Sequence, residues 1–134
     1  MKFNILVIDD EKHIRDGLAV SFEEEGYNVF CAENGKVGLE RFNKGDIDLV
    51  ITDLRMPEIS GEEVVAKVCS ISPRVPVIVL TGHGTVENAV ETMHKGAYDF
   101  LSKPLDLDRL NLIVKRALQK RELVVSYNDL LSQL

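Results

Sequence analysis

The chain has 134 residues, of which 45% are hydrophobic, and a formal net charge of −6. A chain of this length can form one domain with its own core, and its apolar fraction is too high for a disordered protein. The negative charge argues against a surface for nucleic acid or for an anionic membrane. No apolar run approaches the roughly 20 residues that span a bilayer, and the residues after Met1 do not form a signal peptide. We therefore expect a cytoplasmic globular domain.

Two kinds of segment alternate along the chain. Short runs of β-branched and aliphatic residues are typical of strands covered on both faces, and between them apolar residues recur at helical spacing. Strands are predicted at 5–8, 28–32, 49–53, 75–80 and 98–101. Helices are predicted at 12–25, 34–45, 60–73, 85–96 and from about 106 to the end. The alternation predicts an α/β domain with a parallel sheet, and it excludes a helical bundle.

Capping residues and apolar spacing define the predicted helices. Asn34, Ser60 and Thr85 are suitable N-cap residues, and Glu63 completes a capping-box pattern with Ser60. Glycines end the first, second and fourth helices. The residues expected on buried helix faces are Ile14, Leu18, Phe22, Val37, Leu39, Phe42, Val64, Val65, Val68, Ile71, Val86, Ala89, Val90, Met93, Leu107, Leu110, Val114, Ala117 and Leu118.

The two cysteines, Cys31 and Cys69, are far apart in the chain and do not form a Cys-x-x-Cys motif. We expect both to be reduced, small, buried residues. The three histidines show no metal-ligand spacing with one another or with the cysteines, so a zinc site is not expected.

Polar residues stand at the carboxyl ends of four predicted strands. Asp9-Asp10 follows the first strand, Asp53 ends the third, Thr81 follows the fourth and Lys103 follows the fifth. Ligands of open parallel sheets bind outside these ends. We therefore expect these side chains to converge on one functional site.

The residue types at this predicted site favour phosphoryl chemistry. Three neighbouring carboxylates repel one another and call for a cation, and a small set of oxygen ligands suits Mg²⁺. A carboxylate can act as a nucleophile and form an aspartyl phosphate. Lys103 would place a positive charge on a phosphoryl oxygen, and the Thr81 hydroxyl would donate a hydrogen bond to it. Asp53 is the predicted phosphoryl acceptor.

Five separated motifs resemble the receiver domain of bacterial two-component response regulators: Asp9-Asp10, Asp53-Leu54-Arg55-Met56-Pro57, Gly61, Thr81-Gly82 and Lys103-Pro104. The resemblance implies a flavodoxin-like (CheY-like) three-layer sandwich with strand order 2-1-3-4-5. It also implies that a sensor histidine kinase phosphorylates Asp53. Such a domain is regulatory and catalyses only its own phosphorylation and dephosphorylation.

The same resemblance assigns roles to individual residues. Mg²⁺ would be bound by Asp10, Asp53 and the backbone carbonyl of Arg55, with Asp9 assisting through water. Thr81 and Phe100 would form the conformational switch, although Phe100 lacks the hydroxyl that a hydrogen-bonded version of the switch would use. The Lys103-Pro104 peptide bond would be cis.

Two further segments, 81–85 and 96–101, resemble the receivers of NtrC/DctD-type transcription activators. Such activators carry an ATPase domain and a DNA-binding domain further along the chain. We therefore expect a receiver domain at 1–121 and a helical extension at 122–134 that leads toward a missing output domain. A homodimer is expected through this helix or through the fourth helix, fifth strand and fifth helix.

The last helix also carries a weak heptad pattern. Its seam would contain Leu110, Ala117, Val124, Tyr127, Leu131 and Leu134, which suggests a short coiled coil. Lys120 shares the seam position of Tyr127 and weakens the pattern. The alternative is a single long helix whose far end packs on a missing domain.

Three rivals of the receiver remain after the motifs are considered. One is a plain metal-binding module, but no EF-hand pattern or Gly-rich phosphate loop supports an alternative site. A phosphatase of the haloacid-dehalogenase type also forms an aspartyl phosphate, but it needs Asp-x-Asp after the first strand, where this chain has adjacent aspartates. A degenerate receiver would bind partners without phosphate, but no member of the acidic set is missing.

Overall fold

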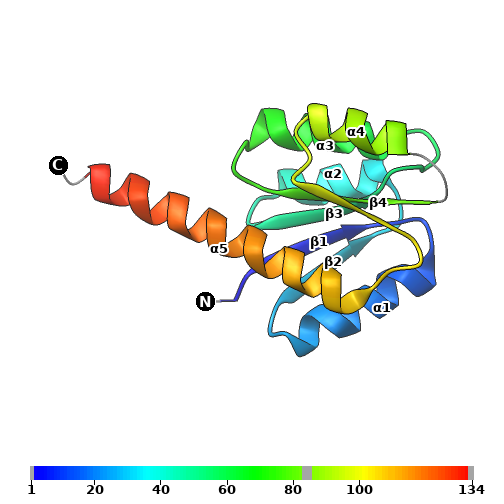
Figure 1. Ribbon diagram of the computed structural model, residues 1–134, viewed down its shortest axis with the longest axis horizontal. Helices are drawn as coiled ribbons and strands as arrows, with labels where there is room; N and C mark the ends of the chain where they lie inside the picture. The colour runs from blue at the N-terminus through cyan, green and yellow to red at the C-terminus, as the bar shows by residue number, and fades with distance from the viewer. Residues whose placement is uncertain (1, 83–85, 133–134) are drawn as a thin grey trace.

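The computed structural model describes residues 2–82 and 86–132, which contain a single parallel sheet between two layers of helices (Figure 1). The strands lie side by side in the order β2-β1-β3-β4-β5, and every neighbouring pair is parallel. They are β1 (Asn4–Ile8), β2 (Asn28–Ala32), β3 (Leu49–Asp53), β4 (Val77–Thr81) and β5 (Asp99–Ser102). The predicted fold class and strand order are therefore confirmed.

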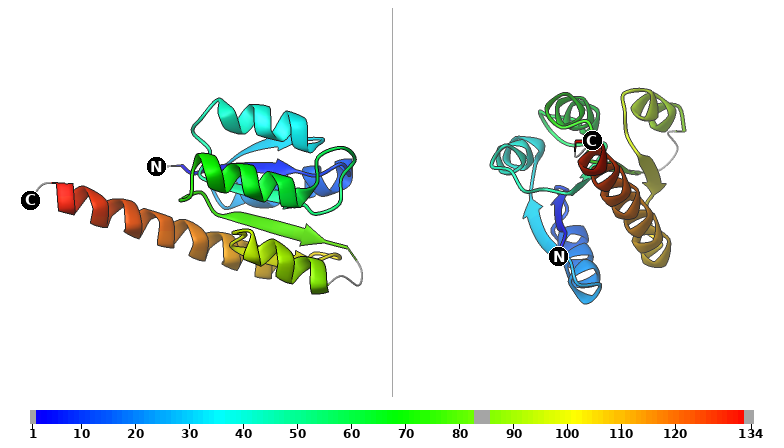
Figure 2. Two further views of the ribbon diagram at one scale, coloured as in Figure 1. Left: turned by 90° about the horizontal axis from the view of Figure 1, so that it is seen from above. Right: turned by 90° about the vertical axis from the view of Figure 1, so that its left-hand side faces the viewer.

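The helices cover both faces of the sheet (Figure 2). They are α1 (Lys12–Glu24), α2 (Gly35–Asn43), α3 (Gly61–Ile71), α4 (Val86–His94) and α5 (Leu107–Ser132). Successive strand residues point to opposite faces. Leu6 and Ile8 of β1 therefore pack in the core beneath α2 and α3, whereas Ile5 and Val7 pack in the core that α1 and α5 cover.

Most predicted boundaries lie within two residues of the observed ones. The fourth strand begins at Val77 rather than Val75. Pro76 has no N–H to donate to a neighbouring strand, and its carbonyl accepts a hydrogen bond from the Val50 N–H. The strand also extends to include Thr81. The predicted cap Thr85 lies outside the described residues.

Two predicted N-caps are confirmed by hydrogen bonds. The Asn34 side chain accepts a hydrogen bond from the backbone N–H of Val37 at 2.9 Å. Ser60 Oγ accepts one from the backbone N–H of Glu63 at 3.3 Å. These bonds satisfy N–H groups that have no partner within the helix, so they define where α2 and α3 begin.

Several residues expected on buried helix faces are exposed instead. The exposed fractions are 39% for Val37, 56% for Ile71, 48% for Val90, 39% for Met93 and 41% for Leu107. The helices bury narrower stripes than the sequence suggests, and in α2 the buried face contains Gly35, Gly38, Leu39 and Phe42 rather than Val37. In α2, a methyl group at Gly38 would overlap the side chain of Ile8.

The two cysteines are less buried than predicted. Cys31 is exposed and Cys69 is half-buried. Cys31 belongs to β2, which forms an edge of the sheet and is therefore less covered than the central strands.

The long helix α5 has a packed part and a projecting part (Figure 1). Leu110, Val114 and Ala117 are buried against the sheet, whereas Leu130 and Leu131 near the other end of the helix are exposed. The first two positions of the predicted heptad seam, Leu110 and Ala117, therefore belong to the core of the domain and are unavailable to a second helix. Within residues 2–82 and 86–132, no helix is both long enough and apolar enough to cross a membrane.

Candidate functional site

The parallel register of the sheet brings the predicted site residues to one edge. Asp53 is the last residue of β3 and lies opposite Leu80, whereas Asp9 follows the last residue of β1. Thr81 lies opposite Ser102, the residue before Lys103. The predicted convergence of these side chains at the carboxyl end of the sheet is therefore what the structure shows.

Lys103 lies among three carboxylates. Its Nζ is 3.1 Å from Asp9 Oδ2, 3.4 Å from Asp53 Oδ2 and 3.4 Å from Glu11 Oε1. The side chains of Asp9 and Asp53 are 0% and 9% exposed, so both carboxylates are largely removed from water. Charged groups are costly to bury, and the shared ammonium compensates for part of this cost.

The burial of these charges changes their proton affinities. Burial, followed by the negative charge of Asp9, raises the pKa of the Asp53 carboxyl from 3.8 to about 6, although Lys103 opposes the change. Burial alone would lower the pKa of the Lys103 ammonium, but its close contact with Asp9 and the negative charges of Asp53 and Glu11 together raise it. Asp53 is therefore largely ionised at neutral pH, and Lys103 is a cation.

The acidic cluster has the composition of a site for a hard divalent cation. Carboxylate oxygens of Asp9, Asp10, Glu11 and Asp53 all lie within 4.8 Å of one another. Asp9 Oδ2 is buried and, among the described residues, accepts no hydrogen bond of good geometry, although it forms the ion pair with Lys103. Oxygen donors with an excess of negative charge fit Mg²⁺. Asp9, Asp10 and Asp53 are the predicted ligands in this cluster, and Glu11 is an addition to it.

Backbone contacts hold the two acidic segments in place. Asp9 Oδ1 accepts a hydrogen bond from the backbone N–H of Glu11 at 2.9 Å, which orients the Asp9 side chain. After β3 the chain turns back, and the Gly61 N–H donates to the Leu54 carbonyl at 2.8 Å. A methyl group at Gly61 would overlap the Asp53 carbonyl oxygen, so glycine allows α3 to begin directly beside the candidate acceptor.

The other predicted site residues lie around this edge. Thr81 is buried, and its hydroxyl donates to the Leu101 carbonyl at 3.3 Å. Phe100 is half-buried against the core beneath α2 and α3. Arg55 is exposed in the loop that follows Asp53. The peptide bond between Lys103 and Pro104 is cis, as expected.

Glu11 is the site residue that the sequence reasoning missed. It directly follows Asp9-Asp10, so the run of three acidic residues was the available signal. The pattern of strand ends did not include Glu11, because this residue lies at the N-cap of α1, beyond the end of β1. Only the folded chain places Lys103, 92 residues further along, beside its carboxylate.

This fold and this acidic edge define a receiver domain. The response regulator receiver domain family matches residues 5–115, and the chain belongs to this family. It is therefore a regulatory phosphoacceptor domain rather than a classical enzyme. Its acidic cluster is typical of the Mg²⁺ site of receivers.

Individual relatives place the chain near NtrC-family activators. Regulatory protein AtoC of Escherichia coli (strain K12) is 44% identical over 115 residues, which cover 86% of this chain and 25% of AtoC. The crystal structure of NtrX from Brucella abortus has 35% identity and a TM-score of 0.90, with coverage of 97% of this chain and 30% of NtrX. A receiver domain protein from Clostridium thermocellum has 36% identity and a TM-score of 0.87, with 91% and 98% coverage.

The chain is much shorter than its regulatory relatives. It spans 25% of AtoC and 32% of the transcriptional regulatory protein GlrR of Escherichia coli (strain K12). The relatives are thus longer proteins, and the matched part is their receiver domain.

Proposed function

We propose that this domain accepts a phosphoryl group on Asp53 from a sensor histidine kinase, with Mg²⁺ held by Asp9, Asp10, Asp53 and the backbone carbonyl of Arg55. The observation that carries the proposal is the position of Asp53, a buried carboxylate at a strand end, 3.4 Å from Lys103 Nζ. When bound, Mg²⁺ neutralises the charge of the acceptor and of the phosphoryl oxygens together.

The transfer itself is a displacement at phosphorus. A carboxylate oxygen of Asp53 attacks the phosphorus of a phosphohistidine, so that an O–P bond forms and the P–N bond breaks. The leaving imidazole nitrogen takes up a proton, and the product is an aspartyl phosphate. Lys103 contributes a fixed positive charge that stabilises the phosphoryl oxygens.

The phosphoryl group then alters the fold through Thr81 and Phe100. The Thr81 hydroxyl exchanges its hydrogen bond with the Leu101 carbonyl, observed at 3.3 Å, for one with a phosphoryl oxygen. This exchange changes the packing of Phe100 on the neighbouring strand. The phosphoryl group favours the second state only by its stronger interaction with that state.

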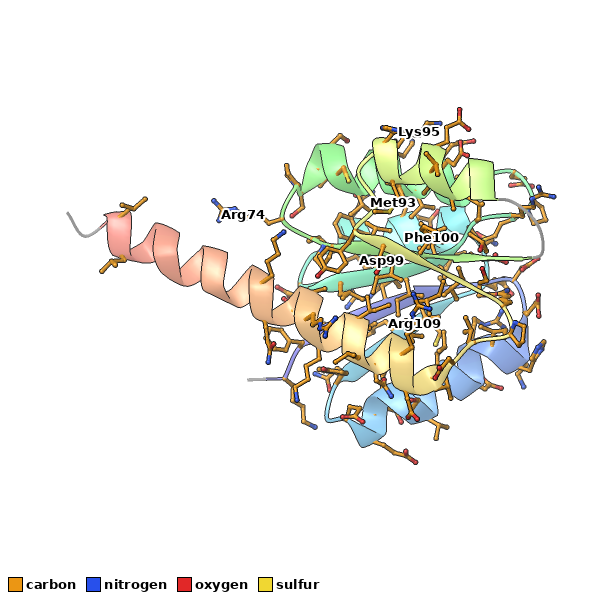
Figure 3. All side chains as sticks on the ribbon, viewed as in Figure 1. Arg74, Met93, Lys95, Asp99, Phe100 and Arg109 are labelled. Carbon is orange, nitrogen blue, oxygen red and sulfur yellow. The ribbon has the colours of Figure 1, made fainter. Side chains whose placement is uncertain are left out.

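The output surface contains α4, β5 and α5. Figure 3 shows Asp99 and Phe100 on β5 between Met93 of α4 and Arg109 of α5. Val90 and Met93 are 48% and 39% exposed. Exposed apolar side chains beside the switch strand are suited to a contact that changes with phosphorylation.

The C-terminal helix connects the receiver to the rest of a longer regulator. We assign residues 1–121 to the receiver and 122–134 to a helical extension, which leads toward ATPase and DNA-binding output domains and pairs two copies. The short span of this chain within its relatives and the exposed Leu130 and Leu131 support this assignment. Sedimentation of the chain with and without residues 122–134 tests it. We expect dimers only when these residues are present, and equal sedimentation of both chains would contradict the assignment.

Intact-mass measurement after treatment with acetyl phosphate and Mg²⁺ tests the phosphoacceptor role. We expect one phosphoryl adduct that needs Mg²⁺ and is removed by hydroxylamine, as an acyl phosphate should be. Asp53→Asn should abolish the adduct. Asp48→Asn, at the opposite end of the sheet, is the matched control and should retain it. An adduct that persists in Asp53→Asn would refute the assignment.

A further inference from the structure

Glu11 uses its side chain in an unusual way for its position. It is the N-cap residue of α1, where a side-chain oxygen often accepts a hydrogen bond from the first helical turn, yet Glu11 makes no such bond. Its Oε1 lies instead 3.4 Å from Lys103 Nζ, and its Oε2 lies 3.2 Å from His13 Nε2. The carboxylate is thus directed toward the cation of the phosphoacceptor site.

The three carboxylates around Lys103 differ in their freedom to move. The side chain of Asp9 is 0% exposed and that of Asp53 is 9% exposed, whereas that of Glu11 is 45% exposed. The ammonium of Lys103 donates hydrogen bonds to Glu11 Oε1 and Asp53 Oδ2, each at 3.4 Å, and forms an ion pair with Asp9 Oδ2 at 3.1 Å. An ammonium has only three donors, so a further acceptor competes with these carboxylates. A phosphoryl group on Asp53 adds new acceptor oxygens beside Lys103, and one carboxylate must then withdraw. Glu11 can withdraw at the lowest cost, because its carboxylate can return to water.

We propose that Glu11 is a positioning residue that holds Lys103 in the resting site and releases it when a phosphoryl group forms on Asp53. The inference rests on the phosphoacceptor role proposed for Asp53. Glu11 competes with the phosphoryl oxygens for Lys103, so it lowers the affinity of the site for the phosphoryl group. It acts through Lys103 and does not touch the phosphorus.

A titration with beryllofluoride, a stable analogue of the phosphoryl group, tests the competition in the full chain with Mg²⁺. We expect Glu11→Gln to lower the apparent Kd about two- to fivefold, the range expected for one partly exposed ion pair. Glu11→Asp keeps the charge but draws the carboxylate back by one methylene group, away from Lys103. It should therefore resemble Glu11→Gln rather than the wild type.

Glu33 offers a matched control for the loss of a charge. It is exposed and lines a hollow together with Asp10, so it lies near the acidic edge. Within residues 2–82 and 86–132, Glu33 forms no ion pair with Lys103, whose acidic partners are Asp9, Glu11 and Asp53. Glu33→Gln should leave the apparent Kd within about twofold of the wild-type value.

A double-mutant cycle shows whether Glu11 acts through Lys103. In a Lys103→Met background, Glu11→Gln should no longer change the apparent Kd, because the two side chains contribute as one unit. The ¹⁵Nζ signal of Lys103 gives the same information if Lys103→Met does not fold. This signal should differ between wild type and Glu11→Gln in the resting state, and it should coincide when both are saturated with beryllofluoride.

Two results would overturn the inference while leaving the phosphoacceptor role intact. One is an unchanged apparent Kd in Glu11→Gln. The other is weaker beryllofluoride binding together with weaker Mg²⁺ binding, which would make Glu11 a cation ligand. In contrast, equal beryllofluoride binding by wild type and Asp53→Asn would refute the proposed function itself, and the inference with it.

Discussion

The polar groups at the two ends of the sheet differ in how fully they are paired. At the amino end, Asp48 Oδ2 accepts a hydrogen bond from the backbone N–H of Asn4 at 2.8 Å. The Asn4 side chain donates to the Asp46 carbonyl at 2.6 Å and accepts from Asn28 Nδ2 at 3.0 Å. These hydrogen bonds connect the starts of β1 and β2 to the segment before β3, so the polar groups there stabilise the fold.

At the carboxyl end, negative charge exceeds positive charge. Asp9, Glu11 and Asp53 share the single ammonium of Lys103, and Asp10 lies beside them. Burial, together with the negative charge of the neighbouring carboxylates, raises the pKa of Asp53 to about 6. Burial of this excess negative charge costs stability when no cation is bound, which agrees with the Mg²⁺ site and phosphoacceptor role proposed above. The comparison indicates that the polar groups at the amino end stabilise the fold, whereas those at the carboxyl end leave negative charge unbalanced.

Among the substitutions that test this difference between the two ends, removal of Lys103 should lower the stability of the domain most. In Lys103→Met, the buried carboxylates of Asp9 and Asp53 lose their shared cation, and the free energy of unfolding should fall by about 3 kcal/mol at pH 8. The loss should be smaller at pH 5, because Asp53 can then be protonated. Urea unfolding at the two pH values measures both quantities. An equal loss at pH 5 and pH 8 would show that Lys103 contributes through packing rather than charge.

Asp53→Asn should change the free energy of unfolding in the opposite direction, by a similar amount. The pKa of Asp53 is about 6 in the folded chain and near 3.8 when unfolded. The folded state therefore binds the proton more tightly, and wild-type stability falls as the pH rises from about 4 to 6. Asparagine does not titrate, so Asp53→Asn should be more stable than wild type by about 3 kcal/mol at pH 8 without Mg²⁺.

The pH dependence provides the control for this prediction. The difference in unfolding free energy between Asp53→Asn and wild type should shrink toward zero below about pH 4, where Asp53 is protonated in both the folded and the unfolded state. Urea unfolding in EDTA from pH 3.5 to pH 8 measures the difference. A constant difference across this range would mean that the burial of the Asp53 charge is not its cause.

Asp48→Ala should have the smallest effect on stability of the three substitutions, and it should leave the site at the carboxyl end unchanged. The change removes the acceptor for the Asn4 backbone N–H, so the free energy of unfolding should fall by about 1 kcal/mol. Phosphorylation by acetyl phosphate and binding of Mg²⁺ should be unchanged, since this acid lies at the other end of the sheet. A loss of phosphorylation in a folded Asp48→Ala chain would show that the two ends are coupled.

Sequence patterns predicted the elements well because they report local physics. Strands with continuous apolar runs, helix caps such as Asn34 and Ser60, and glycine stops each depend on nearby residues. The convergence of Asp9, Asp53 and Lys103 was also predictable, because parallel strands bring their carboxyl ends to one edge. Exposed residues such as Val37 and Ile71 were misassigned, since the width of a buried helix stripe depends on how closely the helix lies on the sheet.

The sequence by itself determined the order of the elements and the meeting of Asp53 with Lys103, because these follow from periodicity and from the polar ends of apolar runs. The tertiary structure alone decided that Leu110 and Ala117 belong to the domain core rather than to a coiled-coil seam. It also decided that Glu11 reaches Lys103. These outcomes depend on distances between segments far apart in the chain, and no local pattern records such distances.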